Sequence, residues 1–228
     1  LSYEYMRDFS RDIDFSKIGR VYSHNLESLK DLRQVYQGPV YFIGPRIMTE
    51  KDYDRLGKNL ETSLDLIDGF GANSWGDFYF YQAYEKPIHL ESHLNIFNSQ
   101  AIDFLLEEGI DDFSLSQELN VDEIDQLIKR QARCEILGYG QLSQMILKHC
   151  PASIVKGCKD DSQCGTCPFA KDISLENEYD SLPVYRNFGY SEVLTDRPIN
   201  ILTMEDRMRS LDVDSIRLVD REDENMKE

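Results

Sequence analysis

The sequence predicts an α/β fold of the (β/α) TIM-barrel type, with a cysteine-rich loop and a small β-hairpin excursion near the C-terminus. Short β-rich runs alternate with helix-like runs at a spacing of roughly 20 to 27 residues, which is typical of parallel strands joined by right-handed crossovers. This spacing is uniform, and the chain has no G-x-G-x-x-G turn of an open dinucleotide-binding sheet. These observations favour a barrel over an open sheet.

Each predicted unit is an apolar strand, a polar turn and a helix. The expected strands cover 20–25, 39–47, 66–73, 87–97, 112–119 and 134–140, and a helix is expected after each of them, the last over 141–149. Thr49 and Asn120 have the side chains of helix N-caps, Asn120 with Glu123 three residues later as in a capping box. Gly109 is an expected C-cap, and Cys134 is expected to be a small core residue.

Six units fall short of the eight that close a TIM barrel. The run 215–220 is expected to add one strand, and we expect an incomplete barrel whose first strands precede this sequence, which does not begin with Met. The expected segments are a barrel portion at 1–149, a cysteine-rich metal-binding loop at 150–180, a closing hairpin, helix and last strand at 181–220, and a charged tail at 221–228. Other domains of a longer chain are the expected partners.

The chain is acidic, with 42 Asp and Glu against 25 Lys and Arg and a net charge of −17. This balance argues against direct nucleic-acid binding, which depends on cations that neutralise phosphates. No apolar run of about 18 residues could span a membrane. The N-terminus lacks the apolar stretch of a signal peptide. We therefore expect a cytoplasmic protein with reduced thiols.

Polar side chains alternate along two of the expected strands. His89, Glu91, His93 and Asn95 share one face of the first, and Ser114, Ser116 and Glu118 share one face of the second. Such a polar interior either holds a ligand or is satisfied by internal hydrogen bonds. Because barrel active sites lie at the C-terminal ends of strands, the candidate pocket residues are Arg46, Asn73, His93, Asn95, Glu118 and Tyr139.

A metal site on the first of these strands is excluded by geometry. His89 and His93 would lie about 13 Å apart in an extended strand at about 3.3 Å per residue. Both cannot bind one ion. The segment "HLESH" is also not the H-E-x-x-H motif of zinc proteases.

Four of the five cysteines lie within "HCPASIVKGCKDDSQCGTCPF", residues 149–169. Pro151 and Pro168 border this segment and are expected to discourage a helix. Four thiolates suit either tetrahedral zinc or an iron–sulfur cluster, and the spacing does not separate the two. Two disulfides are disfavoured by the inferred cytosolic setting. The candidate metal ligands are Cys150, Cys158, Cys164 and Cys167.

Several blocks together resemble peptidase family U32, the collagenase-like proteins. They are "PRIMTEKDYDRL", "DGFGANSWGDFYF", "KPIHLESHLNIFNSQAIDFLLEEGIDDFSLSQELNVDEI" and "EILGYGQLSQMILKHCP". The resemblance runs from about residue 40 to about residue 220 and implies a (β/α) barrel. It also implies one of two activities, a collagenase-like peptidase or an iron–sulfur protein that takes part in hydroxylating bases of transfer or ribosomal RNA, or ubiquinone precursors. Some of the RNA branches draw on prephenate.

The resemblance favours a four-iron, four-sulfur cluster over zinc, since Cys150 matches the family's "HCP" pattern and the other three follow where cluster ligands are expected. The chain departs from the family pattern at Gln141 and Ser143, where Arg and Pro are common, and at Tyr190, where a Cys is common. Three functions follow as expectations: an iron–sulfur hydroxylation enzyme acting on RNA or a small aromatic acid, a collagenase-like peptidase, and a zinc-stabilised non-catalytic module.

Overall fold

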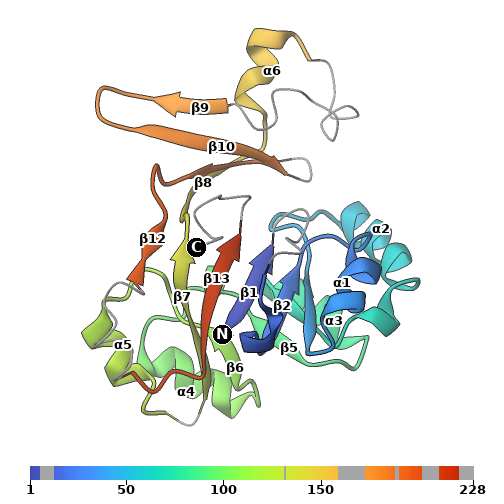
Figure 1. Cartoon of the computed structure of the whole chain (residues 1–228), viewed down its shortest axis with the longest axis vertical. Coiled ribbons are helices and arrows are strands. Elements are labelled where there is room, and N and C mark those ends of the chain that lie inside the picture. The colour runs from blue at the N-terminus through green and yellow to red at the C-terminus, as the bar shows by residue number, and fades with distance from the viewer. Residues whose placement is uncertain (6–12, 131, 159–172, 188–189, 202–210, 221–228) are drawn as a thin grey trace. The chain divides into compact units, whose positions relative to one another are not determined.

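A computed structural model describes residues 1–5, 13–130, 132–158, 173–187, 190–201 and 211–220 (Figure 1). The chain divides into two compact units. One comprises Leu1–Gly140 with Asn200–Glu228, and the other comprises Gln141–Ile199. The sequence predicted segment boundaries after residues 149, 180 and 220. In the structure the second unit is instead an insertion in the barrel unit, which the chain enters after Gly140 and leaves at Asn200.

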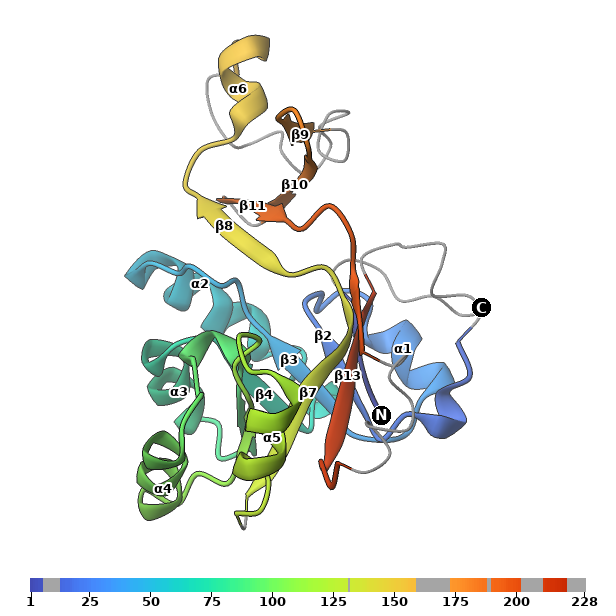
Figure 2. The same cartoon turned by 90° about the vertical axis from the view of Figure 1, so that its left-hand side faces the viewer.

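The first unit is a barrel of parallel strands. Its eight strands within the described residues are β1 (Ser2–Tyr5), β2 (Arg20–Ser23), β3 (Val40–Ile43), β4 (Gly69–Ala72), β5 (Ile88–Leu90), β6 (Asp112–Ser114), β7 (Arg133–Gly140) and β13 (Ser215–Asp220). Strand β13 lies between β7 and β1, and β6 pairs with β7 to close the ring (Figures 1 and 2). The predicted TIM-barrel fold is confirmed. The strand predicted over 215–220 is confirmed as β13. The expectation of an incomplete barrel is wrong, because β1, which was not predicted from the sequence, supplies the eighth strand.

Helices follow β2 to β6 as predicted. They are α1 (Leu29–Val35), α2 (Glu50–Leu60), α3 (Trp75–Gln82), α4 (Ser99–Glu107) and α5 (Val121–Leu127), with short 3-10 helices η1 (Phe15–Lys17), η2 (Leu64–Leu66) and η3 (Ser92–Leu94). The predicted caps are confirmed: Thr49 and Asn120 each form a capping box with the acidic residue three positions later. Gly109 has the positive φ of 77° that suits a helix end.

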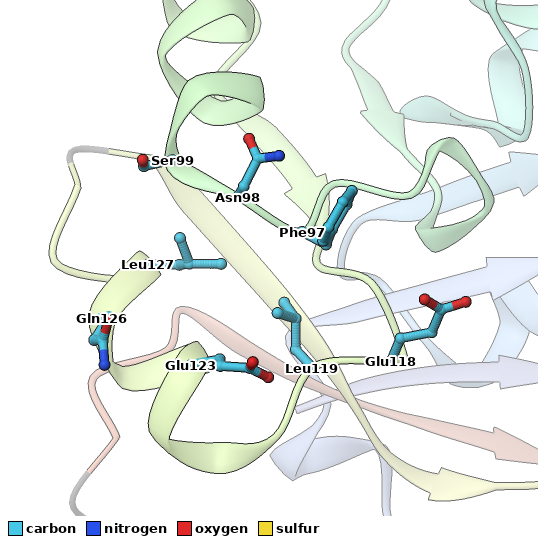
Figure 3. Close-up of a pocket in the computed structure, with 8 residues that line it drawn as sticks. All are labelled: Phe97, Asn98, Ser99, Glu118, Leu119, Glu123, Gln126 and Leu127. Atoms are coloured by element: carbon cyan, nitrogen blue, oxygen red, sulfur yellow. The ribbon is translucent and has the colours of Figure 1, made fainter.

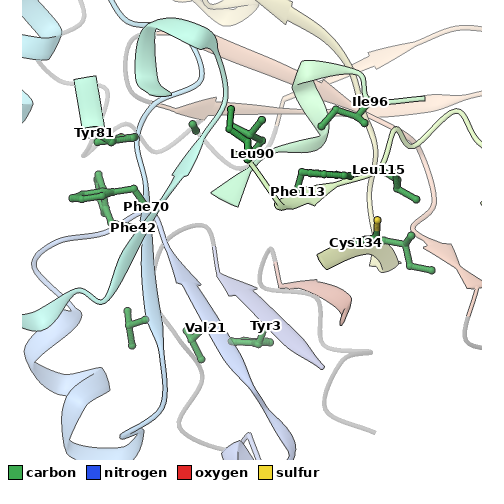
Figure 4. Packing of buried hydrophobic residues seen from close by; sticks show 14 of the residues in the cluster. Tyr3, Val21, Phe42, Phe70, Tyr81, Leu90, Ile96, Phe113, Leu115 and Cys134 are labelled. Atoms are coloured by element: carbon green, nitrogen blue, oxygen red, sulfur yellow. The ribbon is translucent and has the colours of Figure 1, made fainter. Parts of the chain in front are cut away.

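The hydrophobic core lies between the outer face of the barrel and its helices. Alternate strand residues point into it, including Tyr3, Val21, Phe42, Phe70, Leu90 and Phe113 (Figure 4). Tyr81 of α3 stacks on Phe70 with ring centroids 4.3 Å apart. Each such fully buried side chain contributes about 1.5–3 kcal/mol. Cys134 is 1% exposed within this core, as predicted.

The strand expected over 87–97 is shorter than predicted. Strand β5 ends at Leu90, Ser92–Leu94 form the 3-10 helix η3, and Asn95 is left-handed with φ 55°. Asn tolerates this conformation better than most residues. His93 and Asn95 therefore do not extend the strand face that carries His89, and the predicted alternation is wrong beyond the end of β5.

The second unit contains an antiparallel sheet with the order β8 (Ser143–Leu147), β11 (Tyr190–Leu194), β10 (Ser181–Asn187), β9 (Ile173–Glu176). The β10–β11 pair confirms the predicted hairpin. The helix expected over 141–149 is wrong, since β8 pairs there with β11. Strand β12 (Ile199–Asn200) then joins the barrel sheet beside β7.

A helix that the sequence had not predicted, α6 (Pro151–Lys156), follows β8. Pro151 occupies its first turn, where a missing N–H costs no hydrogen bond, and Gly157 ends it with φ 66°. The helix expected between the closing hairpin and the last strand lies mainly outside the described residues, and the tail 221–228 lies wholly outside them. Within the described parts of the chain, no helix is both long enough and apolar enough to cross a membrane.

Candidate active site in the barrel and candidate cysteine metal centre

An arginine surrounded by carboxylates occupies the barrel interior. The guanidinium of Arg217, on β13, donates from Nη1 to Glu4 Oε2 at 2.8 Å and to Glu91 Oε2 at 2.6 Å, and from Nε to Glu135 Oε1 at 2.5 Å. All four side chains are buried. They come from β1, β7, β13 and the end of β5, so the closed ring of strands brings together residues distant in the sequence.

A second ionic cluster lies on the inner face of β2, β5 and β6. Arg20 Nη2 donates to Asp112 Oδ2 at 2.8 Å, and His89 Nδ1 lies 2.6 Å from Asp112 Oδ1. His89 Nε2 lies 2.9 Å from Ser114 Oγ, which donates to Glu135 Oε1 at 3.1 Å. Glu135 therefore links the two clusters.

The cations decide the charge state of these carboxyls. Burial by itself raises the pKa of Glu4, but Arg217 and His24 outweigh it and hold that pKa well below its ordinary value. The pKa of Asp112 is likewise lowered by His89 and Arg20 against burial, and that of Glu135 by Arg217 and His89 against burial. These three carboxyls are thus held in the ionised form by the cations around them.

The contacts Asp112–His89–Ser114 have the connectivity of a Ser-His-Asp triad. Their surroundings oppose that chemistry. Ser114 is 5% exposed and His89 is fully buried, so a peptide carbonyl has no approach to Ser114 Oγ. Ser114 also donates its proton to Glu135 rather than to His89. Among the described residues, the buried polar atoms that face the barrel interior all have hydrogen-bond partners. The sequence left open whether this interior holds a ligand or is satisfied by its own hydrogen bonds, and this observation favours the second interpretation.

A histidine–carboxylate pair lies at the C-terminal mouth of the barrel. His24 follows the last residue of β2, and its Nε2 lies 2.9 Å from Glu4 Oε1. Sequence reasoning missed this pair, although the alternation of Arg20, Tyr22 and His24 along β2 was a signal for it. Glu4 and Arg217 were missed because the strands that carry them lie at opposite ends of the chain.

The six predicted pocket residues lie at or beyond the C-terminal ends of strands. Asn73 Nδ2 donates to the Gly44 carbonyl at 3.1 Å, and Asn95 Oδ1 accepts from Ser116 Oγ at 2.7 Å, so these two amides tie neighbouring loops together. Arg46 and His93 are half-buried in the loops after β3 and β5, and Tyr139 is half-buried near the end of β7.

The sixth predicted residue, Glu118, lines a cavity of about 300 Å³ beside α5 (Figure 3). Phe97, Leu119 and Leu127 supply its apolar surface, and Glu123 is a second carboxylate. The full lining is Phe97, Asn98, Ser99, Glu118, Leu119, Glu123, Gln126 and Leu127. The other five predicted residues do not line this cavity, and their joint role in one pocket stays a prediction.

Two of the four predicted metal ligands lie in the described part of the second unit. Cys150 is the half-buried N-cap of α6, and Cys158 is exposed just after Gly157. Both thiols are free of disulfides. Cys164 and Cys167 lie outside the described residues, and the described residues alone contain no cluster of three metal-binding side chains.

Cys134 differs from these thiols in every respect that matters for binding a metal. It is buried in the barrel core, and burial raises its pKa to about 12. A metal ligand must be the thiolate, so Cys134 does not fit. Cys150 and Cys158 do fit, because each presents a free thiol with solvent access in one short segment.

The sequence profile of peptidase family U32 matches residues 20–218. The chain belongs to this family. The solved structure of the U32 peptidase Mk0906 is similar with a TM-score of 0.51 at 11% sequence identity, covering 98% of this chain and 94% of that one. At that identity the likeness shows a shared fold alone.

A second solved structure, the N-acetylmannosamine-6-phosphate 2-epimerase from Clostridium perfringens, has a TM-score of 0.40 at 11% identity, covering 60% of this chain and 76% of its own. So low a score carries no argument about this U32 protein. A comparison with curated proteins finds no match.

Proposed function

We propose that this U32 chain is an iron–sulfur enzyme module that takes part in hydroxylating an RNA base or a small aromatic acid in the cytoplasm. Cys150, Cys158, Cys164 and Cys167 would bind a four-iron, four-sulfur cluster. Such a cluster supplies one-electron transfer. The observation that carries the proposal is the pair of free thiols at the two ends of α6, in a segment that holds two further cysteines.

The charge distribution is compatible with an RNA substrate. Residues 141–199 contain six Lys and Arg against eight Asp and Glu, so this unit carries a net charge of −2 and the rest of the chain carries −15. Phosphate repulsion is therefore concentrated on the barrel unit rather than on the unit with the cysteines. The net charge still disfavours tight RNA binding by this chain alone, and other domains of a longer chain are the partners that would supply a basic surface.

The test is elemental analysis of protein purified without oxygen. We expect about four iron and four sulfide per chain, with the visible sulfur-to-iron absorption. Cys158→Ser and Cys167→Ser should lose most of the iron, because each removes a proposed ligand. Cys134→Ala is the matched control and should keep it, because Cys134 is buried in the barrel core.

The functional arm measures hydroxylated nucleosides by mass spectrometry in RNA from cells that lack the gene. Expression of the wild-type chain should restore them, and Cys158→Ser should not. One zinc and no iron in the anaerobic protein would replace the proposal with the zinc-stabilised module, for which zinc would have a structural role.

Peptidase activity is the second candidate, favoured by the family and by the Asp112–His89–Ser114 contacts. Their burial and the Ser114–Glu135 hydrogen bond argue against it. Gelatin cleavage by the wild-type chain that is lost in Ser114→Ala and kept in Cys158→Ser would establish this alternative.

A further inference from the structure

We propose that His24 and Glu4 form a proton-transfer site at the C-terminal mouth of the barrel. In the proposed step, His24 Nδ1 takes a proton from a neutral N–H or O–H group of the bound substrate. The resulting imidazolium is balanced by the Glu4 carboxylate. The inference rests on the proposed function only for the identity of the substrate.

Position is the first argument. His24 directly follows β2, whose last residue is Ser23, and Glu4 lies one residue before the end of β1. Both are therefore at the barrel face where TIM-barrel enzymes place their chemistry. Strands β1 and β2 are neighbours with Glu4 opposite Tyr22, so the pair is held by adjacent, hydrogen-bonded strands.

The carboxylate is held in place by the charged interior. Glu4 Oε1 lies 2.9 Å from His24 Nε2, while Glu4 Oε2 accepts from Arg217 Nη1 at 2.8 Å. Arg217 is in turn held by Glu91 and Glu135. A carboxylate fixed in this way sets the ring orientation and the tautomer of its histidine, as the third member of a catalytic triad does.

The other ring nitrogen of His24 has no hydrogen-bond partner within the described chain. Neutral His24 that donates from Nε2 to Glu4 carries its lone pair on Nδ1. In the described chain, Glu4 is the hydrogen-bond partner of the His24 ring, through Nε2, and Nδ1 has none. The side chain keeps 9% of its surface exposed.

The contrast with His89 shows that proton exchange with a substrate requires a ring nitrogen that no protein atom occupies. Both ring nitrogens of His89 face protein oxygens, on Asp112 and Ser114, and its side chain is fully buried. His89 can stabilise the interior but cannot exchange a proton with a substrate. His24 has one nitrogen bound to a carboxylate and one without a described partner.

Charge limits the substrate class. The interior guanidiniums of Arg20 and Arg217 are already paired with Asp112 and with Glu4, Glu91 and Glu135. They offer no free cation to an anionic substrate group. A neutral ring with an ionisable N–H or O–H, such as a nucleobase, fits the site better than a phosphate.

The first test observes the ring directly in the full-length protein. NMR of the ¹⁵N-histidine-labelled wild type at alkaline pH should show His24 as the tautomer protonated at Nε2. Glu4→Ala should give a mixture of tautomers, and Glu27→Gln, an exposed carboxylate in the same loop, should change nothing. A His24 ring protonated at Nδ1 would overturn the proposal.

The second test separates catalysis from folding. His24→Gln keeps an amide N–H that can reach Glu4 but has no basic nitrogen. It should retain the wild-type iron content and thermal midpoint, while hydroxylated nucleosides fall roughly 100-fold or more, the usual range for loss of a general base. Wild-type product levels in His24→Gln would overturn the proposal.

The two proposals fail in different ways. Absence of hydroxylated nucleosides with the wild-type chain contradicts the proposed function and leaves His24 to be decided by the NMR result. Normal product with the wild type and with His24→Gln contradicts the proton-transfer site alone.

Discussion

At the scale of single residues, the barrel interior depends on one buried cation facing three carboxylates. Arg217 forms ion pairs with Glu4, Glu91 and Glu135, each of which would otherwise be a buried carboxylate without a cationic partner. Removing one partner of a buried ionic group costs about 3–5 kcal/mol, although an apolar interior of equal volume would be as stable. The network therefore depends on all of its members being present together.

This network predicts a loss of stability in acid. The folded-state pKa values of Glu4, Asp112 and Glu135 lie below their ordinary values of 4.5, 3.8 and 4.5. Below about pH 4.5 the unfolded chain therefore binds protons that the folded chain does not, and stability falls as the pH decreases towards the folded values. Between pH 7 and pH 3 the unfolding free energy measured in urea should fall by about 2 kcal/mol for Glu4 and about 1 kcal/mol for Asp112, and Glu135 should add a loss of the same sign.

The matched variant is Glu135→Gln, which retains the shape and an oxygen acceptor for Arg217. Its stability should decline less steeply in acid than that of the wild type, since one shifted carboxyl is gone. Glu27→Gln, which alters an exposed carboxylate, should follow the wild-type curve. If the stability of the wild type and of Glu135→Gln declined equally with pH, the lowered pKa of Glu135 would be contradicted.

Some residues of the barrel interior could be predicted from the sequence, and others could not. The alternation of His89 and Glu91 and that of Ser114 with its neighbours predicted a polar interior from single strands. Their partners could not be predicted, because Glu4 and Arg217 are separated by 213 positions and meet only when the ring closes. His24 directly follows the short strand β2 and continues its alternation with Arg20 and Tyr22 in the sequence, but its proposed role depends on Glu4.

At the scale of elements, β4 provides the space for the network. Its inward positions are Gly69 and Gly71. A Cβ at Gly69 would lie 2.6 Å from the Tyr41 ring, and one at Gly71 would lie 2.6 Å from both Glu91 Oε1 and Ile43 Cγ1. Glycine in a strand often marks such a close approach.

Gly71→Ala should therefore destabilise the barrel by about 1–3 kcal/mol, the usual cost of overpacking. Gly57→Ala is the control. A Cβ at Gly57, in α2, meets the Tyr84 hydroxyl at an ordinary 3.5 Å, so the helix propensity of alanine should stabilise by up to about 1 kcal/mol. Urea unfolding measures the change in unfolding free energy of each variant, which should be a loss for Gly71→Ala and a gain for Gly57→Ala. Equal effects would show that β4 tolerates a side chain.

Local signals predicted the elements well where local chemistry determines them. The caps at Thr49 and Asn120 could be predicted from the sequence because a capping box is formed within four consecutive residues. Strand β8 could not be predicted from local signals, because residues 143–147 form a strand by pairing with β11, which lies almost fifty residues later in the chain. Likewise Pro151 opens α6 rather than preventing a helix, because its effect depends on which turn it occupies.

At the scale of the whole molecule, the chain combines two compact units, a barrel and an insertion. The barrel has a closed ring of hydrogen-bonded strands and its own core. The four candidate cluster ligands all belong to the insertion, residues 141–199. The sequence predicted the barrel because its βα spacing is regular, and it misplaced the insertion because its start resembles one more βα unit.

This division predicts that the barrel folds without the insertion. Replacing 141–199 by a short Gly/Ser linker should keep a cooperative unfolding transition by circular dichroism, because β7, β13 and the other barrel strands are retained. The same variant should bind no iron after anaerobic reconstitution, because the only cysteine left is the buried Cys134. A variant that binds iron would move the cluster site out of the insertion. A non-cooperative variant would show that the barrel depends on the insertion to fold, and that the two units act as one cooperative structure.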